Sequence, residues 1–208
     1  MAPIKGKPFL RYILEELILQ GISKVILSVG YKKESIMDYF GDEYRGLHIL
    51  YSEETEPLGT GGAIKKALEL TVESSVFVLN GDTYFQVDFK SLVEQHHKYH
   101  ADLTIALKEM KSIDRYGTVV TLEDKVINFN EKQYMDIGKI NGGIYVITRG
   151  IFNSFEISNK FSFESDFMQV NYEKLDFYGY VSEGYFIDIG IPEDYYKAER
   201  ELKSYYEE

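Results

Sequence analysis

Two aspartates in this sequence lie in or at the end of apolar runs, where a carboxylate can hold a metal ion. "VLNGDTYFQVD" (residues 78–88) reaches Asp82 where a buried strand would end, and "YFIDIGIPEDY" (185–195) places Asp188 between two isoleucines. Ligands of open α/β sheets bind outside the carboxyl ends of the strands, and Mg²⁺ prefers oxygen ligands. Together the two residues could form a Mg²⁺ site for a polyphosphate. Taken singly, each could be a turn residue or a strand-end residue that faces solvent.

A glycine-rich stretch could bring the backbone close to a ligand. "EPLGTGGAIKKAL" (56–68) contains Gly59, Gly61 and Gly62 just where a helix is predicted to begin. Glycines allow close backbone approach, and a helix N-terminus favours an anion or a polar ring edge. The alternative is a loop whose glycines satisfy its own geometry, and the sequence leaves both interpretations open.

Other polar groups could contact a phosphate or a sugar. In "NFNEKQ" (128–133), Lys132 could neutralise a phosphate and Glu131 could accept hydrogen bonds from sugar hydroxyls. The commoner meaning of a Glu-Lys pair is a solvated charge pair. "RYGTV" (115–119) and "INGGIYV" (140–146) add further polar or close-approach groups, namely Tyr116, Gly117, Asn141 and Gly142.

The first half of the chain alternates strands with helices. Strands are predicted at 24–31, 47–54, 74–82 and 102–110, and helices at 7–21, 32–42, 60–70 and 88–101. Such alternation predicts an α/β fold, with a Rossmann-like, mainly parallel sheet and helices on both faces. The histidines at 96, 97 and 100 lie among Lys and Gln. This pattern favours a solvent-exposed helix face rather than a metal site.

The second half has a different pattern, typical of a small antiparallel extension. Residues 117–132 alternate around a tight turn at Glu123 and Asp124, which predicts a hairpin. Further strands are predicted at 140–147 and, as a pair, within 176–190, and a C-terminal helix begins near Pro192. We expect a single domain over 1–208, with a nucleotide-binding part (1–110), a sugar-binding part (111–190) and the C-terminal helix (191–208).

Composition limits the function classes. The chain has 208 residues, 44% of them hydrophobic, which is typical of a globular protein. Its net charge of −11 disfavours nucleic-acid and anionic-membrane binding. It has no cysteine for disulfide or thiolate chemistry, and no apolar run of bilayer length. We therefore expect a cytoplasmic location.

The order of these motifs resembles the sugar-phosphate nucleotidyltransferase family, and "EPLGTGGAI" most resembles its mannose and manno-heptose 1-phosphate guanylyltransferase branch. The resemblance implies transfer from GTP to a sugar 1-phosphate, preferably of manno-heptose, with release of pyrophosphate. It implies Mg²⁺ on Asp82 and Asp188, and the sugar phosphate on Lys132. It assigns the sugar pocket to Tyr116, Gly117, Glu131, Asn141 and Gly142, and the nucleotide to Glu54, Pro57, Gly59, Thr60 and Gly81.

The resemblance also predicts a missing element. The family begins with a strand and a glycine-rich loop carrying an Arg, then a Pro-Lys pair, and this sequence resembles the family only beyond those elements. That first strand would be central, between 24–29 and 76–80. We therefore expect a vacancy there, or its filling by a partner chain in a homo-oligomer, because unpaired strand edges invite association. A truncated version of a longer enzyme is the favoured explanation.

Guanine recognition has a candidate in Glu54, because a carboxylate can accept from both N1-H and N2-H₂ of guanine. A uracil or thymine ring would more naturally meet an amide. Three alternatives stay open: another sugar 1-phosphate such as mannose 1-phosphate, a non-catalytic nucleotide-sugar-binding protein, and a Rossmann oxidoreductase. The last would need a G-x-G-x-x-G fingerprint after a first strand, which the sequence lacks.

Overall fold

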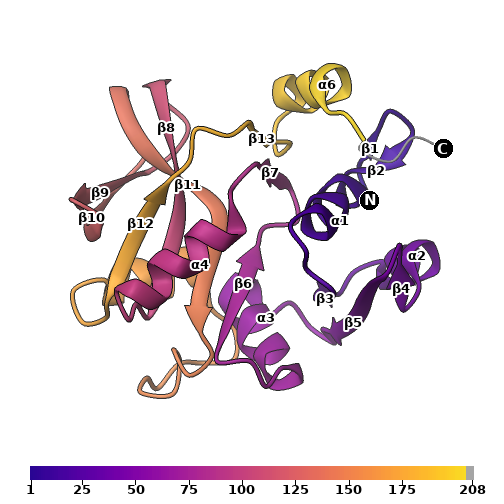
Figure 1. Ribbon diagram of the computed structural model, residues 1–208, viewed down its shortest axis with the longest axis horizontal. Coiled ribbons are helices and arrows are strands. Elements are labelled where there is room, and N and C mark those ends of the chain that lie inside the picture. The colour runs from indigo at the N-terminus through magenta and orange to yellow at the C-terminus, as the bar shows by residue number, and fades with distance from the viewer. Residues whose placement is uncertain (205–208) are drawn as a thin grey trace.

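A computed structural model describes residues 1–204 of the chain. Figure 1 shows the arrangement of its elements. The helices are α1 (Phe9–Leu19), α2 (Lys33–Phe40), α3 (Gly59–Ala67), α4 (Phe89–Lys98), α5 (Gln169–Asn171) and α6 (Pro192–Glu201), with a 3-10 turn at Leu68–Leu70 and a π-helix at Phe163–Met168. The strands are β1 (Pro3–Ile4), β2 (Lys7–Pro8), β3 (Lys24–Val29), β4 (Glu43–Tyr44), β5 (Leu47–Glu53), β6 (Ser75–Leu79), β7 (Thr83–Phe85), β8 (Leu103–Ile113), β9 (Thr118–Leu122), β10 (Lys125–Asn130), β11 (Met135–Thr148), β12 (Phe177–Val181) and β13 (Phe186–Asp188).

The main sheet has the strand order β6-β11-β8-β12-β10-β9. Strand β8 is parallel to β12, and β11 is antiparallel to both β6 and β8. Strands β6, β8 and β12 therefore run in one direction, as the alternation predicts. The expectation of a mainly parallel ladder is wrong for their pairing, because the crossover from β6 through α4 to β8 skips one position and β11 fills it in reverse.

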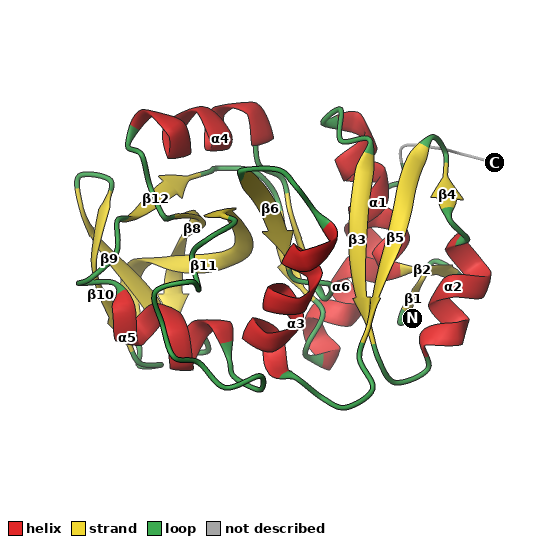
Figure 2. Ribbon diagram, turned by 90° about the horizontal axis from the view of Figure 1, so that it is seen from below, coloured by secondary structure: helices red, strands yellow, loops and turns green. Residues whose placement is uncertain are grey.

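Alternating apolar side chains bury both faces of this sheet. On β11, Tyr145 and Ile147 pack into one core, and Ile144 and Val146 pack into the other. The first core is covered by the π-helix and by α3, and the second by α1 and α4. Figure 2 shows α4 on one side of the sheet and α3 and α5 on the other, which confirms helices on both faces.

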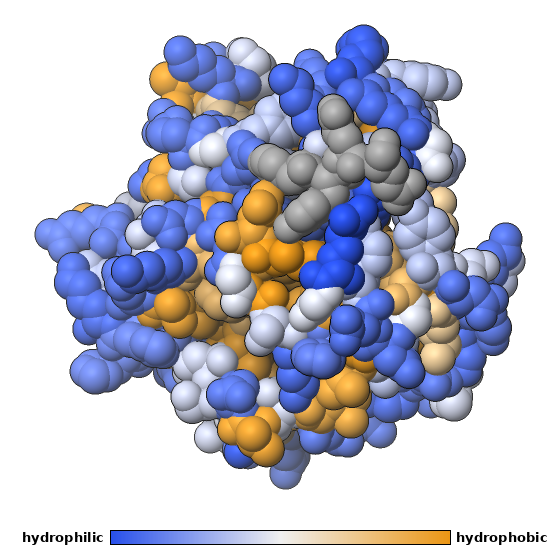
Figure 3. All heavy atoms as spheres, turned by 45° about the vertical axis from the view of Figure 1, so that its right-hand side comes forward, coloured by the Kyte–Doolittle hydropathy of each residue, from blue (hydrophilic) through white to orange (hydrophobic). Residues whose placement is uncertain are grey.

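The strands β3, β5 and β4 form a separate sheet, in which β3 is parallel to β5. Within residues 1–204, β3 pairs only with β5 and β6 pairs only with β11, so no strand lies between β3 and β6. This confirms the expected absence of the central strand. All five residues of β6 are only half-buried, although four of them are apolar. Figure 3 brings the side of the β3-β5-β4 sheet forward, where apolar side chains gather near the middle between hydrophilic ones.

The predicted antiparallel extension is present, with differences at its ends. The hairpin β9–β10 turns at the expected place, where Glu123 adopts a positive φ of 52°. Strand β11 is longer than predicted, because residues 135–139 continue the antiparallel pairing along the end of β8 as far as Ile113. Helix α6 ends at Glu201, and residues 205–208 of the predicted C-terminal helix lie outside the described part of the chain.

The histidine prediction is wrong for His96. Its ring lies against the main sheet, 2% exposed, with Nδ1 3.0 Å from the hydroxyl of Thr104. His97 and His100 are exposed as predicted. Within the described residues, no helix is long and apolar enough to cross a membrane.

Candidate active site

The two aspartates of the predicted metal site are brought together by a short antiparallel pair of strands. Strand β13 pairs with β7 so that Asp188 lies opposite Thr83, and the backbone N–H of Ile189 donates to the carbonyl of Asp82 at 3.0 Å. Strand β6 ends three residues before Asp82, which therefore lies in the turn that enters β7. The residues are neighbours across the strand pair because β7 follows that turn directly.

Both carboxylates are available for a cation. An oxygen of Asp82 accepts from the Thr83 hydroxyl at 3.3 Å, and an oxygen of Asp188 accepts from the Gly190 N–H at 2.8 Å. Within residues 1–204, neither pairs with a lysine or arginine, and no group of three or more His, Asp or Glu residues could hold a metal ion. Two carboxylates suit Mg²⁺, which keeps waters and phosphate oxygens as its other ligands.

A β-bulge places part of the predicted sugar pocket beside this turn. The register of β11 with β8 shifts between Asn141 and Tyr145. There Gly143 adopts φ +73°, and its carbonyl accepts from the N–H of Asn80 at 2.9 Å. The turn 80–82 and the segment 141–143 are therefore in direct contact. A Cβ on Gly142 would lie 2.5 Å from the ring of Phe85, so glycine is needed there for packing.

Tyr116 also lies beside the two aspartates, close to Asp188. Its hydroxyl lies 3.5 Å from a carboxylate oxygen of Asp188 and accepts from Arg115 at 2.7 Å. Arg115 also pairs with Asp194 of α6 at 2.5 Å. Burial and the charge of Asp188 raise the pKa of Tyr116, which keeps the phenol protonated. The next residue, Gly117, packs closely against the backbone of β10, because a Cβ there would lie 2.8 Å from the carbonyl oxygen of Asn130.

The glycine-rich stretch packs against its own chain. A Cβ on Gly59 or Gly61 would come within 2.5 Å or 2.1 Å of Phe161, and one on Gly62 within 2.2 Å of the Asn159 carbonyl. Internal packing therefore requires glycine at these positions, and the approach of a ligand to Gly59 stays a prediction. At Gly81, by contrast, an added Cβ would meet nothing within 4 Å among the described residues, and φ is not positive. The packing of residues 1–204 does not explain a glycine at that position.

Four more of the predicted site residues lie in the segments that follow β5 and β10. Glu54 is half-buried at the end of β5, and one of its oxygens accepts from the Leu58 N–H at 3.0 Å. Pro57 is exposed beside it. Glu131 and Lys132 lie exposed in the loop between β10 and β11. No described contact connects this pair to the aspartates, so the fold does not bring them into the group.

Two functional candidates were missed by sequence analysis. Glu164 is the second residue of the π-helix, and its oxygens accept from the hydroxyls of Thr60 at 2.9 Å and Tyr145 at 3.3 Å. Thr60 is thus engaged within the protein. Tyr145 is 1% exposed, and burial, aided by the charge of Glu164, raises its pKa. A signal was present in "SFES": Ser162 is a helix N-cap, accepting from the Ser165 N–H, but it does not show where Glu164 points.

A comparison with protein families decides where the chain belongs. The model of the family described as "Nucleotidyl transferase" matches residues 1–205. The chain belongs to the nucleotidyl transferase family. This agrees with the resemblance carried by its motifs.

The relatives of this nucleotidyl transferase include proteins whose names state a sugar phosphate. It is 55% identical to D-glycero-alpha-D-manno-heptose 1-phosphate guanylyltransferase of Aneurinibacillus thermoaerophilus, over 99% of this chain and 89% of that one. It is 33% identical to mannose-1-phosphate guanylyltransferase of Mycobacterium tuberculosis, over 97% of this chain and 58% of that one. The crystal structure of HddC from Yersinia pseudotuberculosis complexed with GMP-PN superposes with a TM-score of 0.85 at 40% identity, over 95% and 87% of the two chains.

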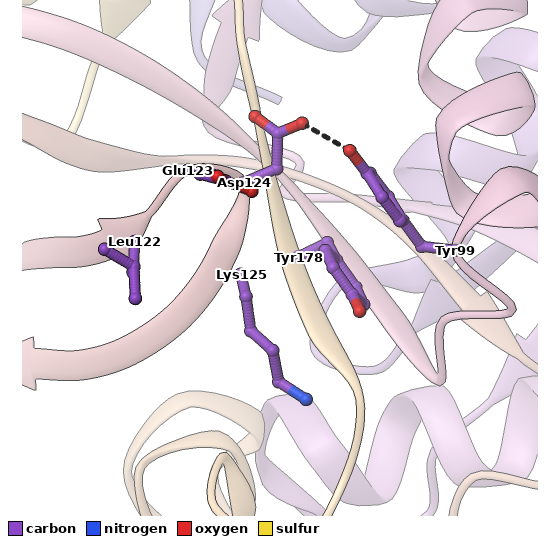
Figure 4. A pocket seen from close by; sticks show the side chains of 6 residues that line it. All are labelled: Tyr99, Leu122, Glu123, Asp124, Lys125 and Tyr178. Carbon is purple, nitrogen blue, oxygen red and sulfur yellow. Dashed lines mark hydrogen bonds between the residues drawn. The ribbon is translucent and has the colours of Figure 1, made fainter.

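A separate hollow of about 420 Å³ lies at the hairpin turn of this nucleotidyl transferase. Figure 4 shows its lining, in which Tyr99 and Tyr178 lie side by side and Tyr99 donates to Asp124. The two rings stack on each other at 4.3 Å, which leaves no room between them for a ligand ring. None of the predicted site residues lines this hollow.

Proposed function

We propose that this nucleotidyl transferase is a sugar-1-phosphate guanylyltransferase that joins D-glycero-α-D-manno-heptose 1-phosphate to GTP, giving the GDP-sugar and pyrophosphate. The observation that carries the proposal is the pair Asp82 and Asp188, held as neighbours beside the bulge that carries Asn141, with no cationic partner among the described residues. The 55% identity to a heptose 1-phosphate guanylyltransferase supports the choice of both substrates.

The reaction needs no nucleophilic side chain. A phosphate oxygen of the sugar 1-phosphate attacks the α-phosphorus of GTP in line, the new P–O bond forms, and the bond to the β-phosphate oxygen breaks to release pyrophosphate. Catalysis then consists of positioning and charge stabilisation. Asp82 and Asp188 would hold Mg²⁺, which offsets phosphate charge when bound.

The other residues orient the substrates. Glu54 would accept from guanine, beside Pro57, Gly59 and Thr60, and the open space around Gly81 would admit the nucleotide backbone. Asn141, Gly142, Tyr116 and Gly117 would line the sugar pocket. Lys132 would bind the sugar phosphate and Glu131 the sugar hydroxyls, once their exposed loop has moved toward the ligand.

The organisation of the chain agrees with these roles. We infer a nucleotide-binding part at 1–110, a sugar-binding part at 111–190 and a terminal helix from residue 191, within one cytoplasmic domain that has no nucleic-acid or membrane partner. An activated GDP-sugar is the form that glycosyltransferases consume, and we infer that this product would be used to assemble a cell-surface polysaccharide. The unpaired edges of β3 and β6 are consistent with association into a homo-oligomer.

The test is pyrophosphate release from GTP with Mg²⁺ and a panel of sugar 1-phosphates that includes manno-heptose and mannose. We expect release with the heptose phosphate, and its loss in Asp188→Asn. Asp114→Asn, at an exposed position in the loop before Tyr116, is the matched control and should keep full activity. A preference for mannose 1-phosphate would correct the sugar. Binding of the GDP-sugar without any pyrophosphate release would favour the non-catalytic alternative.

A further inference from the structure

A chain of hydrogen bonds that passes through the buried Tyr145 connects the predicted sugar side of the site to the predicted nucleotide side. The Asn141 amide nitrogen donates to the hydroxyl oxygen of Tyr145 at 2.8 Å, and this hydroxyl donates to Glu164 at 3.3 Å. The other oxygen of Glu164 accepts from the hydroxyl of Thr60 at 2.9 Å. Asn141 lies in the bulge of β11, and Thr60 lies in the first turn of α3.

The charge of Glu164 sets the direction of every bond in this chain. An ionised carboxylate can only accept, so the single proton of the Tyr145 hydroxyl must point to Glu164. The Tyr145 oxygen is then an acceptor, and Asn141 must present its NH₂ group to it. The Asn141 oxygen is turned the other way, where it accepts from the Gly143 N–H at 3.0 Å. The amide is therefore held in one of its two orientations from both sides.

Burial makes this direction hard to reverse. Tyr145 is 1% exposed, so no solvent water can replace a partner of its hydroxyl, and an unsatisfied buried polar group is costly. Its raised pKa keeps the phenol protonated, as its donor role requires. Glu164 is held in turn by the Ser162 hydroxyl at 3.3 Å and by Thr60, which itself accepts from the Phe163 N–H at 2.8 Å.

We propose that Tyr145 and Glu164 are positioning residues of the sugar pocket, which fix the Asn141 amide so that its second N–H faces the ligand as a donor. This inference rests on the proposed function, because it deepens the role given there to Asn141. The natural acceptor for that N–H is a hydroxyl or phosphate oxygen of the sugar 1-phosphate. The ligand would then accept a hydrogen bond from Asn141, and the direction of this N–H would be set by Glu164 through Tyr145.

The first test is the affinity of Tyr145→Phe for each substrate separately, measured by titration calorimetry. Phenylalanine keeps the ring in the core and removes only the hydroxyl. We expect the Kd for sugar 1-phosphate to rise about tenfold, as for one lost hydrogen bond, and the Kd for GTP to stay within about twofold. Tyr172→Phe is the matched control, because among the described residues that hydroxyl contacts only the exposed side chains of Asn128 and Glu173, and it should change neither affinity.

The second test examines the donor and acceptor directions of these hydrogen bonds without any ligand. In Asn141→Asp, two carboxylates compete for the one proton of Tyr145, and the melting temperature should fall. Adding Glu164→Gln supplies an amide that donates to Tyr145, whose hydroxyl is then free to donate to the new carboxylate at position 141. We expect the double variant to recover at least half of the lost melting temperature, but none of the lost sugar-phosphate affinity, because the ligand then meets an acceptor in place of a donor.

The outcomes separate this inference from the proposed function. If the wild type binds both substrates and Tyr145→Phe changes neither affinity, or weakens both equally, the positioning role is wrong while the guanylyltransferase proposal stands. Additive changes in melting temperature for the Asn141 and Glu164 substitutions would also overturn it. If the wild type binds no sugar phosphate at all, the proposed function fails and this inference fails with it.

Discussion

At the scale of single residues, we propose that the choice of base depends on Glu54, which follows β5. Glu54 is half-buried, and its contact with the Leu58 N–H uses one of its oxygens and fixes its direction. The other oxygen keeps its acceptor capacity. A carboxylate placed in this way suits the donor edge of guanine better than the edge of uracil or thymine.

Replacing Glu54 by glutamine should weaken the discrimination between bases. The amide presents one acceptor and one donor group, so one hydrogen bond to guanine is lost or becomes repulsive. We expect the preference for GTP over UTP and dTTP, measured as the ratio of kcat/KM values, to fall about 10- to 100-fold. Glu56→Gln, at an exposed position in the same loop, is the control. An unchanged preference in Glu54→Gln would contradict guanine recognition by this residue.

At the scale of elements, the start of α3 is built on glycines that the protein itself requires. The segment 159–161 packs where the Cβ atoms of Gly59, Gly61 and Gly62 would be. The N–H of Gly61 also donates to the Phe161 carbonyl at 3.0 Å, which holds the two segments together. Glycine at 81 has no such neighbour among residues 1–204. The two kinds of glycine should respond differently to the same substitution.

Alanine at position 62 should destabilise the fold, and alanine at position 81 should not. The added methyl in Gly62→Ala would lie 2.2 Å from the backbone oxygen of Asn159, and backbone cannot yield as a flexible side chain can. We expect a loss of about 1–3 kcal/mol in the free energy of unfolding, as in other overpacked sites. Gly81→Ala should keep the stability of the wild type but weaken GTP binding. A loss of stability in Gly81→Ala, or its absence in Gly62→Ala, would contradict these assignments.

Sequence patterns predict most of these elements because apolar periodicity reports burial directly. The largely apolar runs in 102–110 and 140–147 place β8 and the end of β11 to within three residues, and the Pro-to-Gly span of 7–21 contains α1. The position of β11 between β6 and β8 has no local signal, because it depends on a crossover that skips a place. Nor does "FESDFM" indicate a π-helix, so the partners of Glu164 could not be predicted.

The candidate site also contains residues whose placement the sequence predicts and residues whose placement it does not. Motif order places Asp82 and Asp188 in one group, and the β7–β13 pairing confirms that they are neighbours. The roles of Glu131 and Lys132 stay predictions, since their loop makes no described contact with that group. The prediction for His96 was wrong because its polar sequence neighbours gave no sign that this one ring packs against β8.

At the scale of the whole molecule, His96 makes stability depend on pH. Burial, and to a smaller extent the nearby charge of His97, lower its pKa from 6.5 to about 4, while Asp102 acts weakly in the opposite direction. The folded protein therefore binds this proton less readily than the unfolded chain does. The stabilising contribution is complete above pH 6.5 and is lost as the pH falls toward 4.

Thermal unfolding measured between pH 7 and pH 4 should show the contribution of His96 to the pH dependence of stability. Within the window, the wild type should lose up to about 1.4 kcal/mol per pH unit through His96 alone. His96→Gln, although less stable at pH 7, should show a shallower decline, because glutamine does not titrate. His97→Gln removes an exposed ring from the same helix and should decline like the wild type. Equal slopes in all the proteins would contradict the assignment.

The break between β3 and β6 has a consequence for the internal motions of the protein. Strands β8 and β11 are paired on both sides, whereas the β3-β5-β4 sheet shares side-chain packing but, within residues 1–204, no backbone ladder with them. Cooperative unfolding units often coincide with such separately bonded parts. In native-state hydrogen exchange, the amides of β3 and β5 should open at a lower free energy than those of β8 and β11. The nucleotide side could then unfold locally while the sugar side stays intact, and a bound nucleotide would slow exchange most in β5, which leads into Glu54.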